Sequence, residues 1–180
     1  MTPTRPRAGV AVFDASPLIF FARVGLLRKS LELFAASIIA DSVREEVVGS
    51  GRQSGTPETP GIEVLLQEGR LTSEAPPETP LGKSLAGNPR LSKADRDSIA
   101  LASASGARLL ADDSAVRAAA KHAGVALGGT LHVLFALVEE RSLTPEQGIE
   151  HLDRLVDLGW YCSARLYRAA RGALEERTRR

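Results

Sequence analysis

The sequence predicts an α/β fold in which a central, mainly parallel sheet is covered by helices on both faces. Three observations support this class. Short continuous apolar runs recur along the chain, and such runs are typical of strands that are buried on both faces. Longer segments with helix-capping residues at their ends separate these runs. This alternation favours parallel strands that are joined by helical crossovers.

The elements are expected in a regular order after a loose tail at residues 1–8. The strands are the apolar runs at residues 10–13 ("VAVF"), 37–40 ("SIIA"), near 70–73, 108–111 ("RLLA") and 125–127 ("VAL"). The helices are expected over residues 17–24, 26–34, 42–49, 91–107, 114–124, 130–141, 144–159 and 163–178, with a short helix or strand at 62–69. The segments 50–60 and 74–89 are rich in Gly, Pro, Ser and Thr, which predicts surface loops.

Capping residues mark where the helices begin and end. Ser16 followed by Pro17 is a typical helix start, because proline is favoured at the first helical position. The other starts are Asp41 or Ser42, Ser92 with Asp95 at the third helical position, Thr144 with Gln147 at the third position, and Ser163. Helix ends are expected at or near Gly49, Gly106 and Gly124.

Composition and charge restrict the classes of function. A length of 180 residues suits one domain with a sizeable core. The 23 basic and 22 acidic side chains nearly cancel, which argues against affinity for nucleic acid through bulk charge. The single cysteine, Cys162, excludes an internal disulfide and fits a reducing compartment. We find no signal-peptide pattern and no apolar run of membrane-spanning length, so we expect a cytoplasmic protein with no membrane partner.

Acidic residues cluster after the expected strands, at the sheet edge where open parallel sheets bind their ligands. Four distant segments contribute them: Asp14 after the first strand, Glu45 and Glu46 in the helix after the second, Asp95 and Asp97 in the helix that starts near 92, and Asp112 and Asp113 after a later strand. Carboxylates that lie close together raise one another's pKa, and a divalent cation relieves this repulsion. Ligation by oxygen alone favours Mg²⁺ or Mn²⁺, which can activate water for attack at phosphorus.

Helix geometry reduces the number of direct ligands. Asp95 and Asp97 point about 200° apart on a helix, and Glu45 and Glu46 about 100° apart, so we expect at most one ligand from each pair. We favour Asp97 because a small, apolar row of residues follows it on the same helix face. We favour Glu46 because two valines follow it directly.

Most of these residues also have a purely structural interpretation. Asp95, Asp112 and Asp113 suit helix N-termini, where capping and the helix dipole favour acids. Arg117 can contact a substrate phosphate or pair with Asp113 four residues earlier. Five further basic residues can follow a nucleic-acid backbone or simply solvate the surface: Arg23, Arg28, Lys29, Lys93 and Arg96. Aromatic residues make up only 4% of the chain, which argues against a base-stacking platform.

In their order and spacing, these motifs resemble the PIN-domain family of metal-dependent ribonucleases over roughly residues 9–138. The stretch "VFDASPLI" is similar to the family's first motif, in which an Asp ends the first strand and a Ser follows two residues later. "SVREEVV" is similar to the segment that carries its Glu. "DRDSIALASASGARLLADD" is similar to its Asp-led helix and the strand that delivers the last acid. The continuation to "GGTLHVL" resembles a prokaryotic subgroup with a paired Asp before an Arg-bearing helix.

The resemblance implies a three-layer α/β/α fold and endonuclease activity on RNA with Mg²⁺ or Mn²⁺, a water nucleophile, and 5′-phosphate and 3′-hydroxyl products. It assigns metal-binding or catalytic roles to Asp14, Glu46, Asp97 and either Asp112 or Asp113, with Ser16, Glu45, Asp95 and Arg117 in support. Many small members are dimeric toxins that an antitoxin inhibits. An RNA substrate, an antitoxin and a homodimer are therefore the implied partners. The catalytic domain is expected at residues 9–140, with a helical extension at 141–180 packed on it.

Two alternatives belong to other classes of function. A phosphatase of the haloacid-dehalogenase type also begins with an Asp after a buried strand, but it needs a second Asp where this chain has Ser16. A degenerate PIN module would bind its partner without catalysis. The presence of acids in all four segments argues against the degenerate module.

Overall fold

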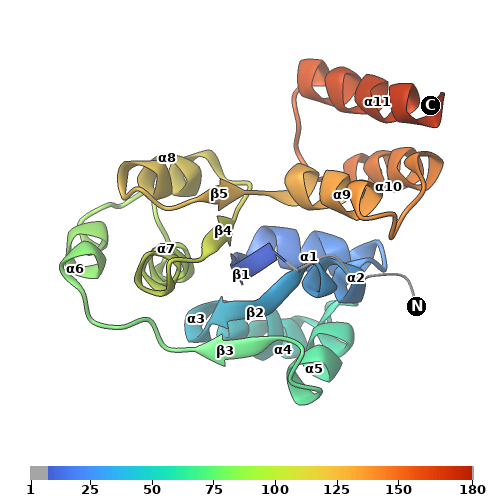
Figure 1. The fold of residues 1–180 in the computed structure, drawn as a ribbon. Coiled ribbons are helices and arrows are strands. Elements are labelled where there is room, and N and C mark those ends of the chain that lie inside the picture. The colour runs from blue at the N-terminus through green and yellow to red at the C-terminus, as the bar shows by residue number, and fades with distance from the viewer. Residues whose placement is uncertain (1–7, 180) are drawn as a thin grey trace.

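The computed structural model describes residues 8–179 and contains one five-stranded parallel sheet (Figure 1). Its strands lie in the order β3-β2-β1-β4-β5, and every neighbouring pair is parallel. Their bounds are β1 Ala8–Phe13, β2 Phe34–Ala40, β3 Thr72–Glu74, β4 Arg108–Leu110 and β5 Leu127–Gly128. This architecture confirms the predicted fold class, an α/β protein with a parallel central sheet.

Helices cover the sheet. Their bounds are α1 Ala15–Arg23, α2 Leu27–Glu32, α3 Asp41–Arg44, the π-helix η1 Glu45–Ser50, α4 Gly51–Ser54, α5 Thr59–Gln67, α6 Pro80–Ala86, α7 Lys93–Ser105, α8 Ser114–His122, α9 Thr130–Glu139, α10 Pro145–Asp157 and α11 Ala164–Thr178. Helix α7 packs on β1, β2 and β4, while α2 packs on β2 and contacts α1 and α9. Ala11, Val12 and Phe13 are all fully buried. Because successive strand residues point to opposite faces, both faces of β1 are covered.

The order of the strands reverses direction beside β1, which makes this position the topological switch point of the sheet. The chain builds β1, β2 and β3 outward in one direction and then returns through α6 and α7 to form β4 on the other side of β1 (Figure 1). The backbone N–H of Asp14 donates to the carbonyl of Leu110 at 3.0 Å, so the ends of β1 and β4 stay together. A crevice at the carboxyl ends of the strands is expected at this position.

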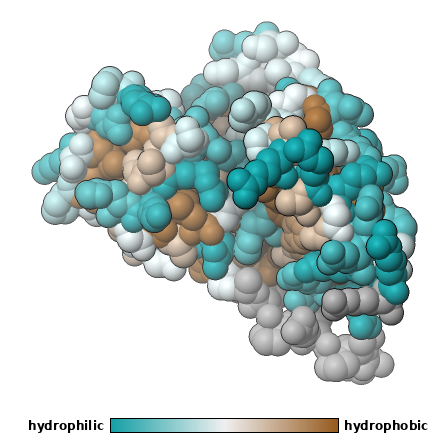
Figure 2. Space-filling view, turned by 90° about the horizontal axis from the view of Figure 1, so that it is seen from above, coloured by the Kyte–Doolittle hydropathy of each residue, from teal (hydrophilic) through white to brown (hydrophobic). Residues whose placement is uncertain are grey.

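The C-terminal helices share the core of the sheet domain. Helix α10 packs against α9 and α11. Leu152, Trp160 and Leu174 are buried in the same hydrophobic cluster as the strands. Seen from the side of α11, the surface mixes hydrophilic and apolar side chains (Figure 2). Among the described helices, none combines the length and the apolar character that crossing a membrane requires.

Most predicted helix boundaries agree with the structure. The side chain of Ser92 accepts from the backbone N–H of Asp95 while the Asp95 side chain accepts from that of Ser92, which is the predicted capping box. Thr144 and Gln147 form the second predicted box. Gly106 ends α7 in the left-handed conformation, at φ 62°.

Four predictions about local structure are wrong. The predicted loop 50–60 contains α4 and the first residues of α5. Helix α1 starts at Ala15 with Asp14 as its N-cap, so Pro17 lies inside the first turn, where a missing N–H costs little. The third helix does not stop near Gly49 but runs through η1 and α4 to Ser54, before left-handed Gly55. The predicted loop 74–89 contains α6, whose Thr79 cap accepts from Gly82 N–H; Thr79 followed by Pro80 is a start signal that the sequence does contain.

Residues 1–7 of the predicted tail lie outside the described part of the chain. The predicted boundary at 140/141 falls in the turn between α9 and α10. The hydrophobic core includes residues on both sides of this boundary, so no break in packing marks it and the boundary stays a prediction.

Candidate active site

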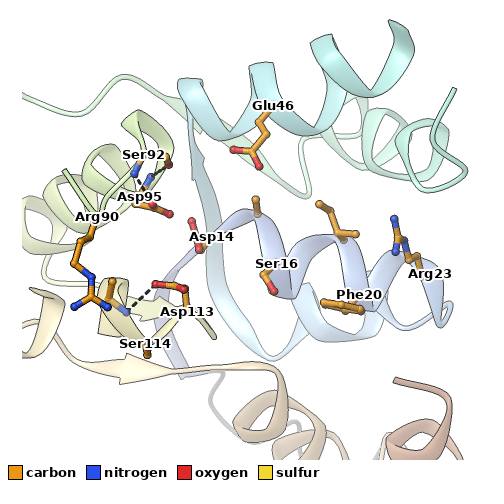
Figure 3. A pocket seen from close by; sticks show the side chains of 13 residues that line it. Asp14, Ser16, Phe20, Arg23, Glu46, Arg90, Ser92, Asp95, Asp113 and Ser114 are labelled. Carbon is orange, nitrogen blue, oxygen red and sulfur yellow. Dashed lines mark hydrogen bonds between the residues drawn. The ribbon is translucent and has the colours of Figure 1, made fainter. Parts of the chain in front are cut away.

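A pocket of about 760 Å³ opens at the carboxyl edge of the sheet, between β1 and β4 (Figure 3). Its walls come from α1, η1, α7, the loop before α7, and the start of α8. The side chains of Asp14, Glu46, Asp95 and Asp113 point toward a common space (Figure 3). Acids from all four predicted segments therefore line one pocket, at the position that the strand order defines.

Asp14 lies at the centre of the pocket and is 4% exposed. Its Oδ1 accepts a hydrogen bond from Ser98 Oγ at 3.3 Å, and the backbone N–H of Ala15 also donates to its carboxylate. Burial is the largest influence on this group and, together with the negative charges of Asp95 and Glu46, raises the pKa of Asp14 to about 7. This site therefore has an excess of negative charge.

Helix α7 presents Asp95 to the pocket, and not Asp97, which sequence analysis favoured. Asp97 forms an ion pair with Lys93 one turn earlier, away from the pocket lining. The capping box fixes where the helix starts, and Ser98 follows Asp95 one turn later on the same face, in contact with Asp14. In the apolar row after Asp97, Ala100 and Leu101 are buried and Ala104 is exposed, but the α7 side chain that contacts Asp14 is Ser98, which lies outside this row.

Glu46 comes from the π-helix η1 and lines the pocket, while Glu45 lines a neighbouring groove. Burial and the negative charge of Asp95 both raise the pKa of Glu46. The hydroxyl of buried Thr59 donates to the carbonyl of Val47 at 3.0 Å, within the π-helical turn. Only Glu46 of this pair lines the central pocket; that at most one of the two binds a metal stays a prediction.

The paired aspartates have different surroundings. Asp113 lines the pocket and caps α8, because its Oδ1 accepts from the N–H groups of Ala115 and Val116. Its Oδ2 has no hydrogen-bond partner among the described residues. Asp112 points away and accepts from Thr130 N at 2.9 Å, Thr130 Oγ1 at 2.6 Å and Trp160 Nε1 at 3.1 Å.

Two supporting residues make contacts other than those expected. Ser16 Oγ lies 3.5 Å from Asp112 Oδ2, so the hydroxyl beside Asp14 is that of Ser98. The Arg117 guanidinium donates to the carbonyls of Ala111 and Gly128 at 2.8 Å and 2.6 Å and thus joins the ends of β4 and β5.

Comparison with known proteins identifies the family. Residues 10–176 match a family model described as a PIN domain. The chain is a PIN-domain protein. PIN domains are generally nucleases that use divalent metal ions, and a nuclease binds nucleic acid. Neither curated proteins nor solved structures yield a match to this chain.

The chemistry of the pocket fits a divalent cation in this PIN domain. The four inward-facing acids offer only carboxylate oxygens, which hard cations prefer. No ion pair within the described residues neutralises Asp14, Glu46 or Asp95, and a bound cation would remove the repulsion that raises the pKa of Asp14. No three Asp, Glu, His or Cys side chains between residues 8 and 179 are already arranged to hold an ion. Binding therefore requires these side chains to rotate toward one another.

Sequence reasoning missed three residues that line the candidate pocket or contact its acids or their neighbours. Ser98 lies one turn after Asp95, a spacing that could have identified it. Arg90 lines the pocket from the loop before α7, and no local pattern marks it. Trp160 reaches Asp112 from the C-terminal extension, 48 residues away in sequence. Of the basic residues considered earlier, Arg23 lines the pocket but is paired with Glu58, and Arg28 is paired with Glu68.

Proposed function

We propose that this PIN domain is a metal-dependent endoribonuclease that hydrolyses RNA phosphodiester bonds with water as the nucleophile. The observation that carries the proposal is the convergence of Asp14, Glu46, Asp95 and Asp113 in one pocket at the switch point. The raised pKa of Asp14 supports it, because its causes are burial first and then the uncompensated negative charge of Asp95 and Glu46. Strongly perturbed carboxylates in a cleft are typical of functional sites.

The proposed ligands of the ion are Asp14, Glu46, Asp95 and the unbonded oxygen of Asp113. Mg²⁺ or Mn²⁺ in such a site lowers the pKa of water and offsets charge on the phosphate. Asp97, which the sequence favoured, and Asp112, which the sequence offered as the alternative to Asp113, are not among the proposed ligands. Asp97 is in an ion pair with Lys93, and Asp112 already accepts several hydrogen bonds.

The chain's own groups prepare the reaction in three ways. Ser98 and the backbone N–H of Ala15 orient the Asp14 carboxylate and favour its ionised form, which offsets only part of the opposing effect of burial. The two N–H groups at the start of α8 orient Asp113. Arg90 lies on the opposite wall from α1 and supplies a positive charge for a phosphate of the substrate backbone (Figure 3).

Incubation of the protein with RNA in Mg²⁺ or Mn²⁺ tests this proposal. We expect internal cleavage, 5′-phosphate ends, and loss of activity with EDTA or with Asp14→Asn. Equal cleavage by the wild type and by Asp14→Asn would show that the activity comes from elsewhere. RNA binding without cleavage would instead support the non-catalytic module. Single-stranded DNA of the same sequence serves to distinguish RNA from DNA specificity.

The toxin role that the resemblance implies extends this proposal and has its own test. Expression in bacterial cells should arrest growth with the wild type but not with Asp14→Asn, and an antitoxin should copurify and restore growth. Size-exclusion chromatography with light scattering measures the proposed homodimer. Unchanged growth alongside RNA cleavage in vitro would reject the toxin role and leave the nuclease in place.

A further inference from the structure

One wall of the pocket is formed by a single face of α1. Ser16, Phe20 and Arg23 lie at positions i, i+4 and i+7 of this helix and all line the pocket, together with Ile19. Phe20 lies one helical turn beyond Ser16, in the direction away from the acids (Figure 3). Ile19 and Phe20 are only half-buried, although both belong to residue types that cores usually enclose. Both pack against the hydrophobic core with one part of their surface and line the pocket with another.

The positive charge at the end of this wall is already neutralised. Arg23 Nη2 lies 2.9 Å from Glu58 Oε1, and Arg23 Nε donates to Glu58 Oε2 at 3.2 Å. The Glu58 side chain is 4% exposed, so this two-point contact fixes the guanidinium and cancels its charge. The α1 wall is therefore apolar at Ile19 and Phe20, and its paired arginine adds little net attraction for a phosphate.

The opposite wall has the reverse character. Arg90 is exposed, and no ion pair among residues 8–179 involves its guanidinium. Ser92 and Ser114 lie on the same side of the pocket (Figure 3). The pocket thus has a positive, polar side, a central group of acids, and an apolar side. A nucleotide has the same division, with a charged phosphate and a planar, apolar base face.

We propose that Ile19 and Phe20 form a nucleobase-binding subsite, in which the base of a nucleotide next to the scissile phosphate packs on the Phe20 ring. The inference rests on the proposed nuclease function and specifies its substrate. Stacking on an aromatic ring tolerates any base, because every base has a π face. A base inside a duplex is already stacked on its neighbours, so this subsite selects single-stranded RNA or an unpaired loop.

The low aromatic content of the chain does not contradict this subsite. Composition argues against an extended platform that stacks several bases in a row. A single base needs a single ring, and Phe20 provides that ring beside the acids.

Binding measurements with a short fluorescent single-stranded RNA in EDTA test the subsite separately from catalysis. We expect Phe20→Ala to weaken binding about tenfold and to raise KM more than it lowers kcat. Phe20→Tyr keeps the ring and should restore binding, whereas Phe20→Leu keeps apolar packing without a ring and should not. Phe135→Ala is a matched control, since Phe135 is also half-buried but lies on α9, where Arg177 packs over its ring.

Abasic nucleotides give the sharper test. A series of RNAs carries one abasic nucleotide each, at successive positions. At one of these positions the missing base should weaken binding to the wild type about tenfold. The same RNA should bind Phe20→Ala as well as the intact RNA does. Thermal unfolding of each variant establishes that it is folded.

The outcomes separate the two proposals. The subsite is overturned if Phe20→Ala binds RNA as tightly as the wild type does. It is also overturned if an abasic nucleotide weakens binding equally in both proteins, even when RNA is cleaved. Phe20-dependent binding without cleavage supports the subsite and rejects the nuclease. A wild type that neither binds nor cleaves single-stranded RNA overturns both.

Discussion

At the scale of single residues, Asp14 has a strongly raised pKa. It is buried and hydrogen-bonded to Ser98, and its pKa is raised to about 7. An unfolded chain would ionise the same carboxyl near pH 3.8. The folded protein therefore holds a proton that the unfolded chain has released across this interval, and folding becomes less favourable as the pH rises through it.

The difference in unfolding free energy between Asp14→Asn and the wild type isolates this contribution. In EDTA the difference should grow from pH 4.5 to pH 7.5 in favour of Asp14→Asn, by on the order of 3 kcal/mol, because only the wild type must ionise a buried group. Urea denaturation at the two pH values measures it. Saturating Mg²⁺ should reduce the difference at pH 7.5. A constant difference across the interval would show that Asp14 titrates normally.

The two acids near the start of α7 have different roles in the structure. Asp95 faces Asp14 and Glu46, whereas Asp97 pairs with Lys93. Asp95→Asn should lower cleavage at least about 100-fold, since it removes a proposed ligand. It should leave stability nearly unchanged, because Asn can still accept from Ser92 N–H. Asp97→Asn, the matched control on the same helix, should keep activity within about threefold. The reverse order of effects, measured as kcat/KM, would favour the original assignment of Asp97.

At the scale of elements, the π-helix η1 holds Glu46 at the pocket. The Thr59 hydroxyl donates to the Val47 carbonyl and also contacts Thr56 Oγ1 at 2.7 Å. A side chain at Gly51 would overlap this hydroxyl, so the glycine makes room for it. Because a side chain inserted at a helix is one cause of irregular turns, we attribute the π-helical turn to this contact.

Thr59→Val tests whether this contact orients Glu46. The valine has a similar shape but leaves the buried Val47 carbonyl without its partner, which should cost about 1–2 kcal/mol of stability. We also expect the Mn²⁺ affinity of the folded protein to fall about tenfold, since Glu46 is displaced. Thr56→Val is the control, because it leaves the bond to Val47 in place. Lower stability with unchanged Mn²⁺ affinity would limit Thr59 to a structural role.

The elements also show how far sequence reasoning reaches. Both capping boxes and the ends of the apolar strands could be predicted, because they depend on hydrogen bonds and periodicity within a few residues. The continuation of the third helix past Gly49 could not. It depends on Thr59, which reaches the helix from the start of α5.

At the scale of the whole molecule, the C-terminal extension is connected to the edge of the pocket. Trp160 lies after α10, is 6% exposed, and donates to Asp112, which also accepts from the start of α9. Asp112 immediately precedes Asp113 in the pocket. Removal of this hydrogen bond should therefore affect the position of the acid that lies next to it.

Trp160→Phe keeps an aromatic ring in the core but removes the N–H donor. We expect a loss of about 1 kcal/mol in stability and a decrease of about tenfold in kcat, because Asp112 loses one of its donors and Asp113 shifts. Steady-state cleavage and urea denaturation measure the two effects. Tyr161→Phe is the control, since Tyr161 is 89% exposed. Full activity in Trp160→Phe would show that the extension only adds stability.

The sequence by itself determined the carboxyl ends of the buried strands β1 and β2, the position of β4, most helix starts and the four acidic segments. Each of these depends on neighbours within one or two turns, and in a parallel sheet residues after successive strands reach the same edge. Only the tertiary structure decided that Asp95 and Asp113 face the pocket while Asp97 and Asp112 do not. The rotation of α7 and the partners of Asp112 come from packing against segments far away in the chain, and no local pattern encodes those contacts.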